Sequence, residues 1–356
     1  MSDDVGADST VLSSAMSLAA GRADALLEAR GVTKHYRRHG LEVRALDGVD
    51  LEVGRGEIVG LVGESGCGKS TLARVLVRQV EPTGGEVFFD GLDIAHRKRR
   101  QLRGIRARLQ IVFQDPLSSL DPRMTVLQAV LEPLRIHGRY TRGESEKLAL
   151  ALLGECGLDA DMAGRYPHQL SGGQRQRVAI ARVLVLHPEM LVLDEPVSAL
   201  DVSVQAQILE LLISLKQAHG LSYVFITHNL AVVRQVSDRI AVMYLGRIVE
   251  NGTRTQVTQA PLHPYTQALL SSVPIEVPAE RGTRQRIILA GDPPSPTSVP
   301  VGCRFESRCW RATDLCRQSE PELGAIGASQ LVACHYPGVD APAPSASILR
   351  SDAGGR

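Results

Sequence analysis

The chain has 356 residues, and its 40 Lys and Arg side chains against 39 Asp and Glu give a formal net charge of +1. This length allows one large or two modest domains, and the balanced charge argues against a nucleic-acid binder driven by bulk charge. No run of eighteen apolar residues occurs, so no segment is predicted to span a bilayer. The start "MSDDVGADST" lacks the basic flank and apolar core of a secretory signal. We therefore expect a cytosolic setting, with the six cysteines as thiols or ligands.

The first third of the chain alternates β-type runs with turn residues. Residues 1–25 are small and polar with weak periodicity, which predicts a disordered start. Between residues 26 and 93 follow the runs "LLEARGVTKHY", "VRALDGVDLEV", "EIVGLVG" and "GEVFFDGLDI", which predict strands. The basic run "HRKRRQLRGIRAR", residues 96–108, is either a solvated helix face or a patch for an anionic membrane or nucleic acid, and the solvated face is our preferred interpretation.

The middle of the chain is predicted to be helical, and a strand–helix–strand pattern follows it. Apolar residues recur at helical spacing in "TVLQAVLEPLRI" and "SEKLALALLGECGL". The apolar runs "EMLVLDEP" and "LSYVFITHN" flank the helix-type "SVQAQILELLISLKQAHG", which indicates a parallel sheet. "RIAVMYLGRIVENG" predicts a hairpin turning near Gly246, and "PLHPYTQALLSSVP" predicts a short helix bounded by prolines. A proline-rich linker and four cysteines follow, and residues 339–356 are predicted to be a disordered tail.

The segment "GESGCGKS", residues 63–70, fits the phosphate-loop pattern G-x-x-x-x-G-K-[ST]. It follows the strand-like "EIVGLV" and opens the helix-like "STLARVLV", as the motif requires. Glycines let backbone N–H groups face phosphate oxygens, and the helix N-terminus adds partial positive charge. We expect Lys69 to reach the β- and γ-phosphates and Ser70 to bind Mg²⁺. The predicted nucleotide contacts here are Gly63, Glu64, Ser65, Gly66, Cys67, Gly68, Lys69, Ser70 and Thr71.

Two carboxylates end the apolar run "EMLVLDEP". Asp194 stands at the C-terminal edge of the predicted strand, where open α/β sheets bind ligands, and a carboxylate there suits Mg²⁺. Glu195 follows it, beside the expected γ-phosphate. Its expected role is to accept a proton from the attacking water.

With these motifs in place, the chain resembles the nucleotide-binding subunits of ATP-binding cassette transporters over about residues 26–274. The resemblance also rests on "VFQDP", "LSGGQ", "SALD" and "FITHN", which occur in the family's order. It implies an α/β fold of the phosphate-loop NTPase class, with a RecA-like parallel-sheet core, an antiparallel β subdomain and a helical subdomain at about residues 116–182. The nucleotide-binding domain would cover residues 26–272, with ATP and Mg²⁺ as cofactors.

The resemblance assigns roles to further residues. Gln114 would touch Mg²⁺ or the attacking water, and His228 would hydrogen-bond the γ-phosphate. Tyr36 would stack on adenine, with a half-buried strand tyrosine as the alternative. In the family two cassettes pair head to tail, so that the signature of one chain faces the phosphate loop of the other, and Asp201 would cross this interface. The signature contacts to the partner's ATP would be Ser171, Gly172, Gly173 and Gln174.

Other segments resemble the oligopeptide, dipeptide and nickel importer branch of the family. They are "VFQDPLSSLDPRMTV", "EPVSALDVSVQAQILELL", "PLHPYTQALLSSVP" and the small cysteine-bearing extension over residues 273–338. The branch implies an ATPase at the cytoplasmic face of the membrane that energises peptide import. Its implied partners are a second, different cassette subunit, two separate permease subunits and an extracytoplasmic substrate-binding protein, with no nucleic acid. An importer of nickel or another small solute is the alternative, and a soluble cassette ATPase outside transport is a third interpretation.

Four cysteines lie in the extension, with five, six and seventeen residues between successive members. Four thiolates could hold an iron–sulfur cluster or Zn²⁺, and the branch resemblance favours a [4Fe–4S] cluster. The spacing lacks the C-x-x-C of common zinc and ferredoxin motifs, so zinc, free thiols and disulfides stay open as alternatives. The four candidate ligands are Cys303, Cys309, Cys316 and Cys334.

Overall fold

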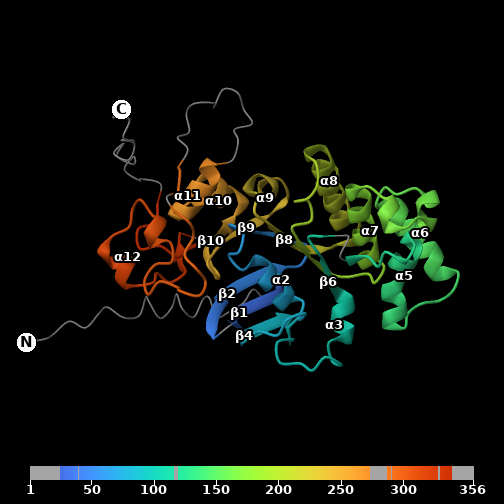
Figure 1. Cartoon of the computed structure of the whole chain (residues 1–356), viewed down its shortest axis with the longest axis horizontal. Helices are drawn as coiled ribbons and strands as arrows, with labels where there is room; N and C mark the ends of the chain where they lie inside the picture. Colours follow the sequence, from blue (N-terminus) through green and yellow to red (C-terminus); the bar gives the residue numbers. More distant parts are fainter. Residues whose placement is uncertain are drawn as a thin grey trace, which may run out of the picture.

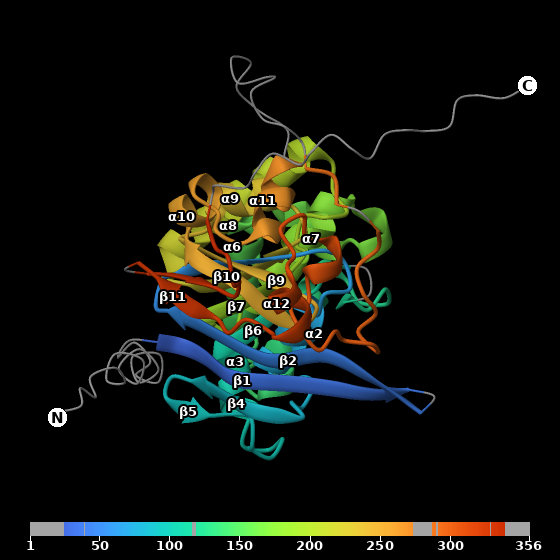
Figure 2. The same cartoon turned by 90° about the vertical axis from the view of Figure 1, so that its left-hand side faces the viewer.

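A computed structural model describes residues 25–38, 40–115, 119–272, 287–289, 291–327 and 329–338. The start before residue 25 and the tail after residue 338, both predicted to be disordered, lie outside the described residues. Two sheets organise the rest: one of eight strands, in the order β11-β12-β10-β9-β3-β8-β7-β6, and one of four, in the order β2-β1-β4-β5. In Figure 2 the small sheet lies on one side of the large sheet, and helices α8, α9 and α11 lie on the other.

The four-stranded sheet is antiparallel throughout, as the resemblance implied. Its two long strands have 14 residues each, and register shifts interrupt their pairing. They extend a few residues beyond the β-type runs in the sequence, which cover residues 26–36 and 43–53. The strands are β1 (Ala25–Arg38), β2 (Leu41–Gly54), β4 (Gly84–Phe89) and β5 (Leu92–Asp93).

The core of the large sheet is parallel, and the predicted strand–helix–strand unit is confirmed within it. Every residue of β3, β7 and β8 is buried, which explains why these strands read as continuous apolar runs. Parallel pairing joins β3 to β8 and β9, and joins β7 to β6 and β8. The strands are β3 (Ile58–Val62), β6 (Leu109–Val112), β7 (Met190–Asp194), β8 (Ser222–Thr227) and β9 (Arg239–Tyr244).

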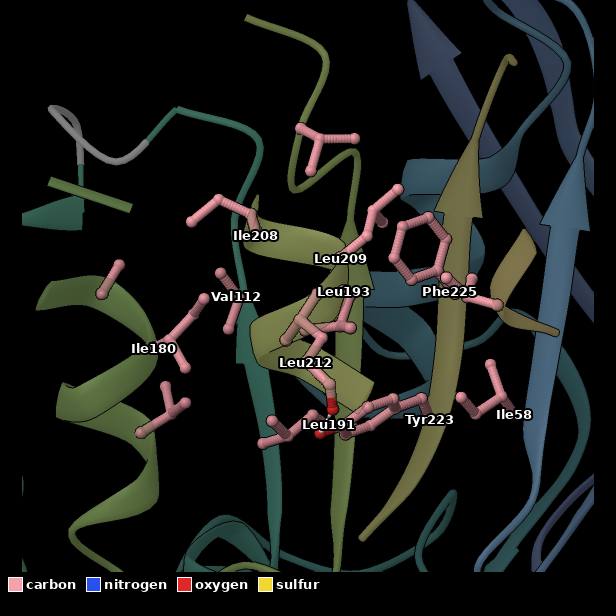
Figure 3. Close-up of a cluster of buried hydrophobic side chains, with 14 of the residues drawn as sticks. Ile58, Val112, Ile180, Leu191, Leu193, Ile208, Leu209, Leu212, Tyr223 and Phe225 are labelled. Carbon is pink, nitrogen blue, oxygen red and sulfur yellow. Dashed lines mark hydrogen bonds between the residues drawn. The ribbon is translucent and has the colours of Figure 1, made fainter. Parts of the chain in front are cut away.

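Alternate residues of the parallel strands serve two hydrophobic clusters. Leu191 and Leu193 belong to the cluster on the helical side, where Figure 3 shows them beside Leu212 of α8. Val192, between them, belongs to the cluster shared with α2 and the four-stranded sheet. Both faces of the parallel strands are therefore buried. This burial sets the register of the strands, and with it the positions of the strand ends that carry the polar motifs.

Helices α5, α6 and α7 pack together at one end of the molecule, and the C-terminal segment with α12 lies at the other (Figure 1). These three helices lie within or beside the predicted helical subdomain. The helices are α2 (Lys69–Leu76), α3 (Arg103–Arg108), α5 (Val126–His137), α6 (Glu144–Glu155), α7 (Gly172–Leu184), α8 (Val202–His219), α9 (Leu230–Val236), α10 (Arg254–Gln259), α11 (Pro264–Ser271) and α12 (Asp314–Gln318). No helix in the described ranges is long and apolar enough to cross a membrane.

The hairpin predicted near Gly246 joins β9 to β10 (Arg247–Thr253), and its turn places Leu245 and Gly246 at positive φ. The far edge of β10 pairs with β12 (Gln330–Val332), which pairs with β11 (Gly324–Ile326). The cysteine-bearing extension therefore continues the sheet of the cassette. The sequence analysis did not predict these two strands, which have only three residues each.

The basic run over residues 96–108 ends in α3, and several of its arginines bind within the chain. Arg106 donates to the carbonyl of Arg78 at 3.0 Å. Arg108 pairs with both Asp90 and Glu189. Part of this run therefore supports the contact between the two sheets.

Candidate nucleotide-binding site

A cavity of about 540 Å³ lies where the phosphate loop meets the carboxyl ends of the parallel strands. The phosphate loop follows β3, Glu195 follows β7 and His228 follows β8, so parallel pairing brings them to one edge of the sheet. The predicted residues that line the cavity are Ser65, Gly66, Gly68, Lys69, Ser70, Thr71, Gln114, Glu195 and His228.

The phosphate loop curls around its own lysine. Lys69 is 4% exposed, and its Nζ donates to the carbonyl oxygens of Gly63 and Glu64 at 2.8 and 2.9 Å. Gly68 has a φ of +111°, and a Cβ there would lie 2.3 Å from the carbonyl oxygen of Ala45. Only glycine fits this position, and it lets the backbone turn directly into the N-terminus of α2. The loop thus presents a positive charge and backbone N–H groups together, which suits a polyphosphate.

The side-chain oxygens of Ser70 and Asp194 lie next to each other at the C-terminal end of β7. The Ser70 hydroxyl donates to Oδ1 of Asp194 at 3.0 Å. Burial raises the pKa of Asp194, and the hydrogen bond from Ser70 opposes this shift. A hydroxyl beside a partly desolvated carboxylate is a donor set that fits Mg²⁺, and the cation's charge would stabilise the ionised carboxylate.

Three predicted catalytic side chains meet at one oxygen atom. Oε2 of Glu195 lies 3.1 Å from Nε2 of Gln114 and 3.3 Å from Nδ1 of His228. The Glu195 side chain is 11% exposed, whereas that of His228 is 51% exposed. Glu195 also has a φ of +48°, which is uncommon outside glycine, and its N–H is held by the carbonyl of Ile226 at 3.0 Å. Backbone strain of this kind is often found at functional positions, and Glu195 lines the cavity.

The signature residues do not line this cavity. Ser171 is the N-cap of α7: its hydroxyl accepts from the N–H of Gln174 at 3.2 Å, and its own N–H donates to Oε1 of Gln174 at 2.9 Å. The sequence analysis missed this capping box, although the S-x-x-Q pattern signals it. A Cβ on Gly173 would lie 2.6 Å from Cγ1 of Val204, so this glycine lets α7 approach α8. Asp201, at the start of α8, is exposed.

Five cavity residues were missing from the sequence-based site: Val43 and Ala45 of β2, Ser198 and Ala199 shortly after Glu195, and Pro296 of the C-terminal segment. Tyr36 does not line the cavity, but it pairs directly with Val43 across β1 and β2. Paired residues share a face of the sheet, so Tyr36 lies beside the cavity wall. Val43 and Ala45 could have been found only from the register of the two strands. The stacking of Tyr36 on adenine remains a prediction.

The four cysteines of the extension line a second, much smaller cavity of about 20 Å³. Burial raises the pKa of Cys303 to about 12 and that of Cys309 to about 11, and neighbouring cysteines add to both shifts. All four are free thiols. Across the residues that the structure describes, no three His, Cys, Asp or Glu side chains are arranged to hold a metal ion. The cysteines therefore share a cavity without forming a ligand geometry.

Comparison with known proteins agrees with this site. Residues 46–198 match the ABC transporter family model, and residues 249–316 match the C-terminal region of oligopeptide/dipeptide transporters. The oligopeptide transport ATP-binding protein AppF of Bacillus subtilis is 46% identical over 326 residues, which cover 89% of this chain and 99% of that protein. The chain belongs to the ABC transporter family. The probable peptide ABC transporter ATP-binding protein y4tS of Sinorhizobium fredii is 48% identical over 335 residues, or 92% of this chain and 94% of that protein.

Solved structures of ABC cassettes share the fold. The dimeric structure of MJ0796, a bacterial ABC transporter cassette, has a TM-score of 0.60 and 34% identity, and the match covers 64% of this chain and 98% of that one. The cbiO1 cassette of Clostridium perfringens has a TM-score of 0.59 and 29% identity, covering 66% and 90%. The expected cassette fold is confirmed. This ABC subunit is an ATPase coupled to transport, and its family implies ATP, Mg²⁺ and membrane permease partners.

Proposed function

We propose that this ABC subunit hydrolyses ATP to energise the import of oligopeptides or dipeptides through separate permease subunits. The observation that carries the proposal is the contact of Gln114 and His228 with the carboxylate of Glu195, beside a phosphate loop. The same chain has a C-terminal region that matches that of oligopeptide/dipeptide transporters. The alignments with relatives named as peptide or oligopeptide transport proteins cover nearly the whole length of those relatives, which supports the same solute class for this chain.

The site residues divide the chemistry among themselves. The loop amides and Lys69 bind the β- and γ-phosphates, and Ser70 and Asp194 would hold Mg²⁺, which supplies charge neutralisation when bound. Glu195 accepts the proton of the attacking water. Gln114 and His228, both within hydrogen-bonding reach of that carboxylate, orient the water and the γ-phosphate.

The signature completes the site only in a pair of subunits. Ser171 caps α7 outside the cavity of its own chain, so we infer that it meets the ATP of a partner cassette. The backbone amides of Gly172, Gly173 and Gln174 at the helix N-terminus suit that γ-phosphate, and the exposed Asp201 would reach across the interface. MJ0796, which shares this fold, forms a dimer bound to ADP and Pi. We expect a different paralogue as partner, at the cytoplasmic face of the membrane with two permeases and an external substrate-binding protein.

Transport by the reconstituted complex tests the proposal. The chain would be purified with its permease partners, placed in proteoliposomes, and supplied with the binding protein, ATP and a mixture of labelled di- to pentapeptides. We expect ATP-dependent peptide uptake that Lys69→Ala abolishes, because the variant cannot bind ATP. Uptake of radiolabelled nickel with none of the peptides would overturn the peptide assignment.

We also propose that the four extension cysteines bind a [4Fe–4S] cluster. The shared cavity and the thiol donors support this, although the thiols would have to separate around the cluster, since the present cavity is only about 20 Å³. The raised pKa values of Cys303 and Cys309 mean that metal binding would release protons. Protein purified without oxygen should show visible iron–sulfur absorption and contain iron. A colourless protein containing zinc would overturn the cluster.

A further inference from the structure

The phosphate loop is held by an arginine from the cysteine-bearing extension. Nη1 of Arg308 lies 2.8 Å from Oε2 of Glu64, and Nη2 lies 3.1 Å from Oε1, so the two side chains form a paired, charge-assisted contact. The Arg308 side chain is 7% exposed and that of Glu64 is 27% exposed. This contact joins residues 244 positions apart in the sequence.

The backbone of Glu64 is also anchored from outside the loop. Its N–H donates to the hydroxyl of Tyr265, on α11, at 2.8 Å. The Tyr265 ring packs against Tyr244 and against Phe305 of the extension, at centroid distances of 4.7 and 5.5 Å. Arg308 donates to the Tyr244 hydroxyl as well, at 3.4 Å. An aromatic cluster and one arginine therefore fix both the main chain and the side chain of Glu64.

Glu64 is the link between this cluster and the phosphate-binding lysine. Its carbonyl oxygen accepts a hydrogen bond from Nζ of Lys69 at 2.9 Å. Only glycine fits at the preceding position 63, because a Cβ there would lie 2.2 Å from the carbonyl oxygen of Met243. A change in the position of Glu64 is therefore transmitted to Lys69.

Charge gives this contact a second consequence. Glu64 is the single acidic residue in "GESGCGKS", a loop that has to attract an anion. An unpaired carboxylate there would repel the β- and γ-phosphates, and the low dielectric of a partly buried site would strengthen the repulsion. Arg308 turns the carboxylate toward the extension and neutralises it.

We propose that Arg308 is a positioning residue for ATP binding: the extension supplies the charge that holds Glu64 and makes the phosphate loop attractive to a triphosphate. The proposal rests on the function assigned above to this loop. It gives the C-terminal extension a part in the nucleotide site that is independent of any metal at the cysteines.

Charge removal on either side of the pair tests the proposal. Titration of the full-length chain with a fluorescent ATP analogue would compare the wild type with Arg308→Gln, Glu64→Gln and the double variant. We expect Arg308→Gln to weaken binding about tenfold, by exposing an unpaired carboxylate to the phosphates. The double variant should bind about as well as Glu64→Gln alone and more tightly than Arg308→Gln, because the repulsive charge is gone.

Rescue by Glu64→Gln separates positioning from a purely structural role, since loss of packing by Arg308 would not be repaired from the loop. Unchanged binding by Arg308→Gln, or a double variant as weak as Arg308→Gln, would overturn the proposal. Should Arg308→Gln fail to fold by circular dichroism, Arg308→Met, which also removes the charge but keeps a long unbranched side chain, replaces it in the same cycle with the same criteria.

Two further variants complete the design. Arg317→Gln removes an exposed arginine of the same extension, paired with Asp314, and should bind ATP as the wild type does. Lys69→Ala tests the assigned function of the loop separately. If Lys69→Ala retains full ATP affinity, the phosphate-loop assignment fails; if it loses affinity while Arg308→Gln does not, only the role of Arg308 fails.

Discussion

Glu195 combines a strained backbone with a carboxylate oxygen that both Gln114 and His228 approach. Glu195→Gln keeps the shape of the side chain but cannot accept a proton from water. We expect ATP hydrolysis to fall by a factor of about 10² or more, with ATP affinity retained. ATP-bound dimers should then accumulate in size-exclusion chromatography with light scattering when ATP and Mg²⁺ are present. Normal turnover by the variant would remove Glu195 from the catalytic role.

The residues of the site differ in how far the sequence could reveal them. The phosphate loop, Asp194 and Glu195 were predictable because phosphate and Mg²⁺ demand particular residue types at fixed spacing after a strand. Pro296 and Arg308 were not, because they reach the site only through tertiary contacts. Arg308 lies 244 positions from Glu64, and nothing in its local sequence marks it.

At the scale of elements, the N-terminus of α7 has two functions that one substitution can separate. In the single chain Ser171 caps the helix. In the dimer, we infer, it faces the γ-phosphate of a partner's ATP. Ser171→Asp should preserve the cap, because aspartate is as good an N-cap as serine. Its negative charge would meet the phosphate, so we expect unchanged thermal stability but loss of ATP-dependent dimerisation. Dimers that form as readily as those of the wild type would contradict the head-to-tail arrangement.

Glu250 of β10 connects three elements and is fully buried. Its carboxylate accepts hydrogen bonds from the N–H groups of Leu262 and His263, at 2.8 and 3.0 Å, and from the Gln330 amide of β12 at 2.7 Å. Glu250→Gln would turn an NH₂ group toward these donors, at a cost of about 1–3 kcal/mol. We therefore expect the variant to melt at a lower temperature than the wild type.

The pH dependence of that difference follows from the carboxyl group. Burial raises the pKa of Glu250 above its unfolded value, so the protonated form favours folding. This stability is complete below the unfolded pKa of about 4.3 and is lost as pH rises through the folded pKa. The difference in melting temperature between wild type and Glu250→Gln should thus narrow as the pH rises above about 4.3. A difference that stays constant with pH would contradict the raised pKa of Glu250.

At the scale of the whole molecule, the sequence predicted the parallel core better than the edges. Strands β3, β7 and β8 are buried throughout, so their apolar runs are easy to recognise, and the helix between β7 and β8 predicted that these two strands are parallel. Strands β11 and β12 are too short to carry a pattern, and their pairing depends on an edge offered by β10. The sequence therefore indicated an appended segment, whereas the structure has a continuous sheet.

Because the sheet is continuous, we predict that the cassette without its extension is less stable than the full chain. Deletion of residues 273–356 would uncover the edge of β10 and remove Phe305 from the rings of Tyr244 and Tyr265. An exposed strand edge promotes association between chains, and loss of a buried phenylalanine costs about 3 kcal/mol or more.

We expect the truncated chain to melt at a lower temperature and to aggregate with increasing concentration in sedimentation velocity. Deletion of residues 339–356 is the matched control, because it leaves every described strand and helix of the extension in place. A truncated cassette that stays monodisperse and melts with the wild type would mean that the extension rests on the sheet without stabilising it. Because Arg308 leaves with the same segment, the truncated chain should also bind ATP more weakly, so edge protection and loop positioning would be lost together.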